Sequence, residues 1–260
     1  MPAWIAIANQ KGGVGKTTTA INLAASLAAA DCRLLLIDSD PQGNSSSGLG
    51  VEPSPEQPTL YDVIVGESAP QAAVCKTGFA GLDVLPASPH LAGANVELAS
   101  VPDPASRLRR AREGFGAEYD FVLLDCPPAL DLLTVNALVA ADSVLIPMHC
   151  EYFALEGISS LLQTMESVRA ELNPELAIEG VVLTMYDGRT SLTRQVAEEL
   201  RAHFGPQLLE TVIPRNVRLA EAPSHGMPAL QYDIRSKGAA AYLALAREIL
   251  GRAKRKALNR

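Results

Sequence analysis

Residues 8–19 read ANQKGGVGKTTT, and this stretch decides the fold. An apolar run, AWIAIA at residues 3–8, precedes it, and KTTTAINLAASLAAA at residues 16–30 has the periodicity of a helix. Glycines between a strand and a helix let backbone N–H groups turn toward a phosphate, and the start of the helix favours its negative charge. The order of strand, glycine loop and helix therefore predicts a phosphate-binding loop. One lysine would suffice in such a loop, so its second lysine needs an explanation.

Apolar runs recur along the chain, and helical stretches such as residues 154–172 lie between them. RLLLID at 33–38 and FVLLD at 121–125 are apolar nearly throughout, as strands buried on both faces of a parallel sheet are. The remaining runs are LDVLPA at 82–87, SVLIPM at 143–148, IEGVVLTM at 178–185 and LLETVIP at 208–214. This alternation predicts an α/β fold, a doubly wound and mainly parallel sheet with helices on both faces. Without repeats or a long linker, we expect one P-loop domain over residues 1–260, ending in a basic helix at about 239–260.

Composition excludes several classes of protein. The chain has 260 residues, 48% of them hydrophobic, which is ample for a buried core. The opening MPAWIAIANQ lacks the basic and apolar regions of a secretion signal, and no apolar run approaches the ~20 residues that cross a bilayer. The cysteines are scattered, without a CxxC pair, at Cys32, Cys75, Cys126 and Cys150. Reduced, buried thiols in a cytoplasmic protein fit this pattern better than disulfides or a zinc site.

The net charge of −7 is unevenly distributed along the chain. Residues 1–184 contain 9 basic and 22 acidic side chains, whereas residues 185–260 contain 13 basic and 7 acidic ones. The last third therefore carries a net charge of +6. A polyanion partner and simple solvation of the basic faces both account for this asymmetry, and composition alone leaves the two open.

Each residue type in the loop suits one part of a nucleoside triphosphate. Lys16 would reach the β- and γ-phosphates, the Thr17 hydroxyl would ligate Mg²⁺, and Thr18 would contact the α-phosphate. The strict spacing GxxxxGKT is not met, because Lys11 stands where the first glycine would be. The loop is thus the variant KGGxGKT. The backbone N–H groups that we expect to surround the phosphates belong to Gly12, Gly13, Val14 and Gly15.

Several motifs together suggest a family. KGGVGKTT at residues 11–18 is followed by DSDPQGNSSSGLG at 38–50 and by FVLLDCPP at 121–128. In this order they resemble the deviant Walker A ATPases of the ParA/MinD family, and the ParA/Soj chromosome-partitioning proteins most of all. The resemblance extends over nearly the whole chain, through EYFALEG at 151–157, TMYDGRT at 184–190 and IPRNVRLAEAPSHG at 213–226.

The resemblance implies a function as well as a fold. It implies a weak, Mg²⁺-dependent ATPase that forms a homodimer with ATP and binds double-stranded DNA without sequence specificity. A ParB-like centromere-binding protein would stimulate hydrolysis, and the cycle would drive chromosome segregation. We therefore expect a nucleoid-associated protein.

The resemblance also explains the second lysine. In the family this lysine crosses to the other subunit of a nucleotide-sandwich dimer and contacts the phosphates bound there, a role that would fall to Lys11. A cation at the loop entrance can neutralise a triphosphate that faces it, most strongly where two subunits exclude water. Gly12 would let the two backbones approach closely. The alternative is a lysine that is merely solvated at the rim.

Carboxylates follow two of the buried runs, at the sheet edge where ligands bind in open α/β folds. By resemblance, Asp40 would orient or activate the attacking water, and Asp38 would support Mg²⁺ or its waters. Asp125 would hold Mg²⁺ through water, as a Walker B residue does. A turn or a helix cap is the alternative for each aspartate. Since the loop contains no evident arginine finger, we expect slow hydrolysis until a partner completes the site.

Two further sites are implied by the resemblance. Pro214 and Arg215 would line the adenine, with Asn216 beside them, and the absence of an NKxD motif favours ATP over GTP. Arg189 and Arg218 match arginines that bind DNA in ParA-like relatives. Contacts of this kind are made to phosphates and carry little sequence information.

Two alternatives of other classes remain to be compared with the structure. A MinD-like membrane-associated ATPase for division-site placement would use an amphipathic C-terminal helix, and residues 242–260 are basic and helical. Their bulky apolar residues precede the basic cluster instead of opposing it, so we expect the first half to dock on the core, with no membrane partner. A redox protein like nitrogenase reductase would need paired cysteines at a dimer axis, and Cys126 has no convincing second cysteine.

Overall fold

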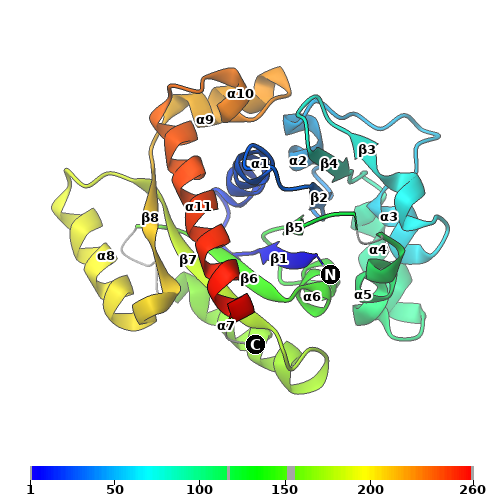
Figure 1. Cartoon of the computed structure of the whole chain (residues 1–260). Coiled ribbons are helices and arrows are strands. Elements are labelled where there is room, and N and C mark those ends of the chain that lie inside the picture. Colours follow the sequence, from blue (N-terminus) through cyan, green and yellow to red (C-terminus); the bar gives the residue numbers. More distant parts are fainter. Residues whose placement is uncertain (1, 116–117, 151–155, 259–260) are drawn as a thin grey trace.

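The computed structural model describes residues 2–115, 118–150 and 156–258, in which eight strands form one sheet (Figure 1). In chain order the strands are β1 (Ala3–Ile7), β2 (Leu34–Asp38), β3 (Cys75–Lys76), β4 (Leu82–Leu85), β5 (Phe121–Asp125), β6 (Ser143–His149), β7 (Ala177–Tyr186) and β8 (Leu208–Pro214). Their order in the sheet is β3-β4-β2-β5-β1-β6-β7-β8. Every pair is parallel except β3 with β4. The predicted doubly wound, mainly parallel α/β fold is thus confirmed.

Helices connect the strands, and side-chain caps define where some of them begin. The Asp131 carboxylate accepts hydrogen bonds from the first turn of one helix, and the Thr190 hydroxyl caps another. The α-helices are α1 (Lys16–Ala28), α2 (Asn44–Gly48), α3 (Leu60–Val65), α4 (Leu91–Glu97), α5 (Arg107–Ala111), α6 (Leu132–Ala140), α7 (Glu156–Glu171), α8 (Ser191–Phe204), α9 (Val217–Glu221), α10 (Ala229–Tyr232) and α11 (Lys237–Leu258). Short 3₁₀ helices cover Pro70–Ala73, Leu98–Ser100, Pro104–Ser106, Arg112–Phe115, Gly205–Gln207 and Ala222–His225.

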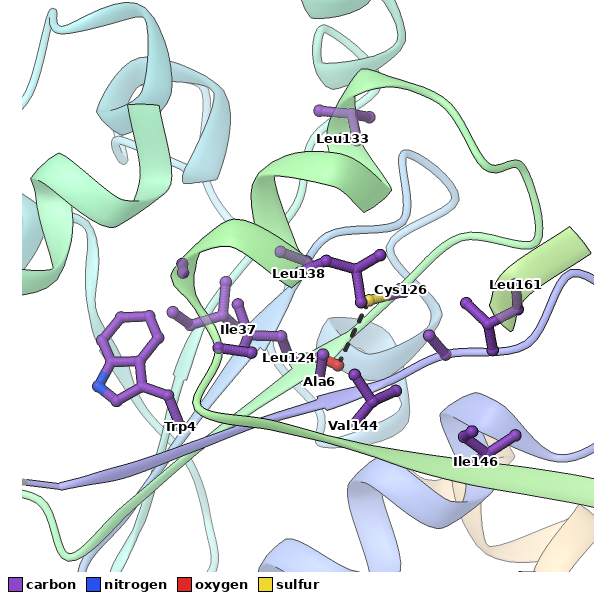
Figure 2. Close-up of a cluster of buried hydrophobic side chains, with 14 of the residues drawn as sticks. Trp4, Ala6, Ile37, Leu124, Cys126, Leu133, Leu138, Val144, Ile146 and Leu161 are labelled. Carbon is purple, nitrogen blue, oxygen red and sulfur yellow. Dashed lines mark hydrogen bonds between the residues drawn. The ribbon is translucent and has the colours of Figure 1, made fainter. Parts of the chain in front are cut away.

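The sheet separates two apolar cores, because successive side chains of a strand point to opposite faces. In β1, Trp4 and Ala6 belong to one core, whereas Ile5 and Ile7 belong to the other. Figure 2 shows the first core, where side chains of the central strands meet those of α6 and α7. Helices α1 and α11 cover the opposite face, where Tyr242 is fully buried.

The order of the strands determines where a ligand would bind. From β1 the chain passes over β5 to reach β2, whereas β6 pairs with β1 on its other side. The strand order therefore reverses next to β1, and open α/β sheets bind ligands at the carboxyl ends of the strands beside such a reversal. The loop at residues 8–15 leaves β1 at this point.

Helix α11 bears on the membrane-associated alternative. Its apolar residues Tyr242, Leu245 and Ile249 are buried in the core that includes α1, so they are not available to a lipid surface. Within the described residues, no helix combines the length and the apolar character needed to cross a membrane.

Candidate functional site

The loop between β1 and α1 adopts a conformation that its glycines make possible. Gly13 and Gly15 have φ angles of +73° and +84°, in the left-handed region that side chains with a Cβ rarely enter. Gly15 is the N-cap of α1, and its carbonyl accepts the first helical hydrogen bond from the Thr19 N–H. No atom lies within 4 Å of where a Cβ would stand at Gly12 or Gly13. The loop is therefore open on the side where a phosphate would approach.

Side chains from neighbouring strands hold this loop in place. The Asn9 amide donates a hydrogen bond to the Pro147 carbonyl in β6 at 2.8 Å, and its oxygen accepts one from the Lys11 N–H. In β7, the Thr184 hydroxyl donates to the Val14 carbonyl at 2.8 Å. Because these partners lie on two different strands, the loop is fixed in shape before any ligand arrives.

Lys16 lies inside the loop and is almost fully buried. Its Nζ donates a hydrogen bond to the Lys11 carbonyl oxygen at 3.2 Å. Burial lowers the pKa of Lys16, while the carboxylates of Asp125 and Asp40 act to raise it. The ammonium group is thus positioned where the two strand-end carboxylates and a bound phosphate would meet.

Lys11 is half-buried at the start of the loop. A Cβ built on Gly157, in the first turn of α7, would lie 3.9 Å from the Lys11 Cδ, so the lysine stem runs along that helix. Residues 151–155 of the EYFALEG motif fall outside the described part of the chain.

Asp38 and Asp125 are directly opposite each other in the parallel pair β2–β5, and both are completely buried. Asp38 Oδ2 accepts hydrogen bonds from the backbone N–H and the hydroxyl of Ser46, at 2.8 and 2.7 Å. Asp125 Oδ2 accepts one from the Ser45 hydroxyl at 2.6 Å. The two buried carboxylates are therefore tied to consecutive serines of α2.

Burial raises the pKa of both carboxyl groups. For Asp38 it reaches about 6, with the hydrogen bonds from Ser46 acting in the opposite direction. For Asp125 it reaches about 7, because the neighbouring Asp38 charge adds to the effect of burial. The hydroxyls of Ser45 and Thr17 lower the pKa of Asp125. The two carboxyls therefore lose their protons at a higher pH than ordinary aspartates do.

These pKa values make the stability of the nucleotide-free protein depend on pH. In the unfolded chain each carboxyl has its ordinary pKa of 3.8, whereas the folded protein keeps its protons to about pH 6 to 7. Since the folded state then binds more protons, its stability falls as the pH rises through this window. Asp125→Asn removes one ionisation, so we expect it to raise the melting temperature at pH 8 by about 3 °C or more, the effect of about 1 kcal/mol at this chain length.

Thermal unfolding of both proteins without Mg²⁺ or nucleotide checks this expectation. The difference should shrink as the pH falls from about 7, and it should disappear only below 3.8, where the wild-type carboxyl is protonated in both states. A variant less stable than the wild type at pH 8 would contradict it.

The oxygen atoms around Asp125 fit a hydrated Mg²⁺ ion. Asp125 Oδ1 is buried and has no hydrogen-bond partner among the described residues. In that part of the chain no three His, Cys, Asp or Glu side chains gather closely enough to hold a metal. Mg²⁺ usually keeps several waters and takes one or two protein oxygens together with phosphate oxygens, so the site suits it without a dedicated cage of carboxylates.

A cavity of about 770 Å³ opens over the loop. Most predicted ligand-binding residues line it, namely Gly12, Gly13, Gly15, Lys16, Thr17, Thr18, Asp40, Pro214, Arg215 and Asn216. Val14 contributes no side chain to this wall because it is buried in the core, and Asp38 and Asp125 lie beneath it. The Asn216 side chain caps α9 by accepting a hydrogen bond from the Arg218 N–H, so its oxygen is already engaged.

Met185 and Tyr242 also line this cavity, and the sequence alone did not predict either of them. Met185, at the end of β7, has a φ of +48°, a strained conformation that often marks functional sites. Its position after a buried run could have revealed it, since strand ends form the site. Tyr242 comes from α11, and its hydroxyl shares a hydrogen bond with Thr19 at 3.0 Å. No local pattern connects a tyrosine in the last helix with the first loop.

A larger cavity, about 920 Å³, lies elsewhere, between α2 and the segment 51–62. The described residues that line it include Glu52, Glu56 and Glu67 but no lysine or arginine. A triphosphate needs cations and oriented N–H groups, so the smaller cavity over the loop is the candidate nucleotide site.

Arg189 and Arg218 lie on the surface, and each is paired with carboxylates. The Arg189 guanidinium contacts Asp187 at 2.6 Å, and this hydrogen bond lowers the pKa of Asp187 to about 2. Arg218 contacts Glu221 at 2.7 Å and Asp233 at 3.4 Å. The sequence motifs alone did not indicate that these guanidinium groups have partners within the chain.

Three arginines of the last third lie at two ends of the sheet. Because Tyr186 pairs with Pro214, the segments that carry Arg189 and Arg218 leave the sheet at the same edge, beside the cavity. Arg252 of α11 instead donates hydrogen bonds to the carbonyls of Glu179 and Pro206, near the beginnings of β7 and β8. Helix α11 runs between these two regions (Figure 1).

The cysteines give no support to a redox centre. All four are unpaired in the structure, with Cys32 and Cys75 only partly buried. Cys126 is buried in the core shown in Figure 2, where its thiol donates weakly to the Leu124 carbonyl. A cysteine ligand to a cluster at a dimer axis would have to be accessible, and Cys126 is not.

The fold and this loop define the class of the protein, which is a P-loop nucleoside-triphosphate-binding protein. A family model described as an AAA domain matches residues 3–178. The chain is 56% identical over 250 residues to the chromosome partitioning protein ParA of Caulobacter vibrioides (strain NA1000 / CB15N), covering 95% of this chain and 94% of that protein. It is 53% identical over 245 residues to the sporulation initiation inhibitor protein Soj of Bacillus subtilis (strain 168), covering 94% and 97%. The chain therefore belongs to the ParA/Soj family of chromosome-partitioning ATPases.

Solved structures share the fold. Cobyrinic acid a,c-diamide synthase from Mycobacterium smegmatis, with bound ADP and magnesium, is 35% identical and has a TM-score of 0.86 over 98% of this chain and 96% of that chain. The septum site-determining protein MinD from Pyrococcus horikoshii OT3, complexed with Mg-ADP, is 28% identical with a TM-score of 0.77 over 96% of both chains.

Proposed function

We propose that this protein is an ATP-driven switch of chromosome segregation. It binds ATP and Mg²⁺, dimerises, binds double-stranded DNA without sequence preference, and leaves DNA after a ParB-like centromere-binding protein has stimulated hydrolysis. The observation that carries the proposal is the cavity of about 770 Å³, whose lining combines Lys16 and Asp40 with apolar residues such as Ile213 and Pro214. Polar groups that suit a triphosphate and apolar groups that suit a base are what a nucleotide requires.

The residues of the loop would bind and orient the triphosphate. The Lys16 ammonium would neutralise the β- and γ-phosphates, and the Thr18 hydroxyl would contact the α-phosphate. Thr17 would provide a ligand to Mg²⁺, while Asp125, supported by Asp38, would accept hydrogen bonds from its waters. When bound, the metal supplies charge neutralisation at the phosphate oxygens.

Asp40 is the residue that would orient the attacking water. It lines the cavity, and its Oδ1 accepts a hydrogen bond from the Gln42 N–H at 3.0 Å, which fixes the direction of the carboxylate. Among the described residues that line the cavity, the one arginine is Arg215, which follows Pro214 and is assigned here to the base. Charge that develops at the γ-phosphate thus lacks an arginine from this wall, which fits a slow enzyme that a partner accelerates.

Lys11 would join two subunits through the nucleotide. We expect Lys11→Ala to raise the dissociation constant of the ATP-bound dimer about tenfold or more, because one desolvated ammonium–phosphate contact is lost on each side. Light scattering in the presence of a non-hydrolysable ATP analogue measures the dimer, and fluorescent ATP binding to the monomer should change little. Lys237→Ala, an exposed lysine at the start of α11, is the control. A full dimer in the Lys11 variant would exclude the cross-subunit role.

DNA binding would use the edge that carries Arg189 and Arg218. A dimer presents four such cations. A plot of the logarithm of affinity against the logarithm of salt concentration should therefore have a negative slope, of which these four arginines contribute about −4 if each binds one phosphate. Arg189→Glu should weaken binding about tenfold or more for every duplex sequence, with ATP binding and dimerisation retained. Arg110→Glu is the matched control, since Arg110 is an exposed arginine of α5 that also pairs with a carboxylate, that of Asp103.

The experiment is co-sedimentation with DNA in ATP, in ADP and without nucleotide. We expect the wild type and the Arg110 variant to bind DNA in ATP but not in ADP or without nucleotide. The Arg189 variant should bind DNA weakly even in ATP. Binding that ignores the nucleotide, or a loss confined to one DNA sequence, would overturn the proposal.

A further inference from the structure

Two consecutive serines of α2 have no role in the site as described so far. Ser45 and Ser46 are both buried, and each hydroxyl donates to a different strand-end aspartate. We propose that Ser45 and Ser46 are positioning residues. Ser45 orients Asp125 toward hydrated Mg²⁺, and Ser46 holds Asp38, which anchors the segment that carries Asp40. This inference rests on the proposed function, because it assigns residues to the metal side of the same nucleotide site.

Ser46 connects three parts of the fold. Its N–H and its hydroxyl both donate to Asp38 Oδ2, and its hydroxyl oxygen accepts a hydrogen bond from the Ala87 N–H, just past β4, at 3.2 Å. The other oxygen of Asp38 accepts from the Asp40 N–H at 3.3 Å. Asp38 therefore does not reach the cavity itself. It anchors α2 on one side and the backbone of the water-orienting residue on the other.

Ser45 determines which oxygen of Asp125 is left for a ligand. The Ser45 hydroxyl donates a hydrogen bond to Oδ2 at 2.6 Å, whereas Oδ1 is buried and has no hydrogen-bond partner among the described residues. A buried carboxylate oxygen without a donor is unfavourable unless a ligand completes it. With Oδ2 held by Ser45, the carboxylate cannot rotate freely, and Oδ1 is the atom that a metal-bound water would meet.

The position of the serines explains why both are needed. Asp38 and Asp125 are opposite each other in adjacent strands, so the two like charges repel at close range when both groups are ionised. The donors from α2, one to Asp125 and two to Asp38, offset this repulsion and orient both carboxyl groups. Since α2 begins at Asn44, directly after the segment 40–43, the same contacts hold Asp40 at the cavity. Removal of a group that orients a metal-binding carboxylate typically lowers metal affinity or activity 10- to 100-fold.

The test uses fluorescent ADP, titrated with Mg²⁺ and separately in EDTA. Ser45→Ala and Ser46→Ala should each raise the Mg²⁺ concentration for half-maximal tightening of ADP binding about tenfold, and leave the affinity in EDTA unchanged. Ser46→Thr retains the hydroxyl and should restore most of the Mg²⁺ response. Ser47→Ala is the matched control, because Ser47 is exposed on the same helix and, within the described chain, its hydroxyl hydrogen-bonds to the Gly43 carbonyl and to neither aspartate.

The outcomes separate this inference from the proposed function. If the wild type shows no Mg²⁺-dependent binding of ADP or ATP, the proposed function itself fails. If the wild type responds to Mg²⁺ while the Ser45 and Ser46 variants behave like Ser47→Ala, the inference is wrong. An equal loss of ADP binding in EDTA, with a lowered melting temperature and no rescue by Ser46→Thr, would also overturn it, because the serines would then support only the fold.

Discussion

Lys16→Ala is expected to lower the affinity for ATP about 100-fold or more. The Lys16 ammonium lies within the loop and is drawn toward Asp125 and Asp40, so it is in place before the triphosphate binds. Two charge-assisted hydrogen bonds to phosphate oxygens contribute roughly 1.5–3 kcal/mol each, and about 1.4 kcal/mol is a factor of ten in affinity. Equilibrium binding of a fluorescent ATP analogue to the purified variant measures the loss.

The control for Lys16→Ala is Lys76→Ala, which changes the net charge of the protein by the same amount. Lys76→Ala removes an exposed lysine that pairs with Asp83 at the far edge of the sheet. It should bind ATP as the wild type does, and thermal unfolding should show that both variants are folded. Unchanged ATP affinity in Lys16→Ala would remove the loop from the nucleotide site.

Asp40→Ala is expected to reduce ATP turnover about 100-fold or more while ATP affinity changes less than about threefold. In the proposed site Lys16 and Thr17 would still bind the triphosphate and its metal, but the attacking water would lose its orienting carboxylate, a contribution of typically 10²–10⁴ in rate. The variant should therefore accumulate as an ATP-bound dimer that stays on DNA. On one preparation, phosphate release measures turnover, light scattering measures the dimer, and co-sedimentation measures DNA binding.

Asp40→Asn separates the charge of this residue from its structural role. Its amide oxygen can still accept the Gln42 N–H hydrogen bond that holds the turn. We expect it to be nearly as inactive as the alanine variant, because the amide cannot take a proton. Normal turnover of either variant in the presence of a ParB-like partner would remove Asp40 from the mechanism.

The sequence was most informative where periodicity and composition act locally. Each of the seven apolar runs forms a strand, because a segment such as β5 can be buried on both faces only in the middle of a parallel sheet. Strand β3 was missed. It has two residues, Cys75 and Lys76, and it pairs antiparallel with β4 at the edge of the sheet, so no apolar run marks it.

Parts of the site that depend on contacts across the fold could not be predicted. The contact of Tyr242 with Thr19 joins residues 223 positions apart, and the donors to Asp38 and Asp125 are serines in a short polar stretch that reads as a turn. Their role follows only from the packing of α2 over the ends of β2 and β5. The loop itself was predictable because its ligand-facing groups are backbone atoms whose directions the glycines determine.

The carboxylates beside the surface arginines act as built-in counterions. If a DNA phosphate binds Arg189 as proposed and displaces Asp187, the free carboxylate would take up a cation from solution, which would partly offset the cation that the DNA releases. The same exchange would apply to Arg218, whose partners are Glu221 and Asp233. Each arginine would then contribute less to the salt dependence than its charge suggests. The protein could hold DNA with an affinity that varies little as the ionic strength of the cell changes, and could release it without a large electrostatic penalty.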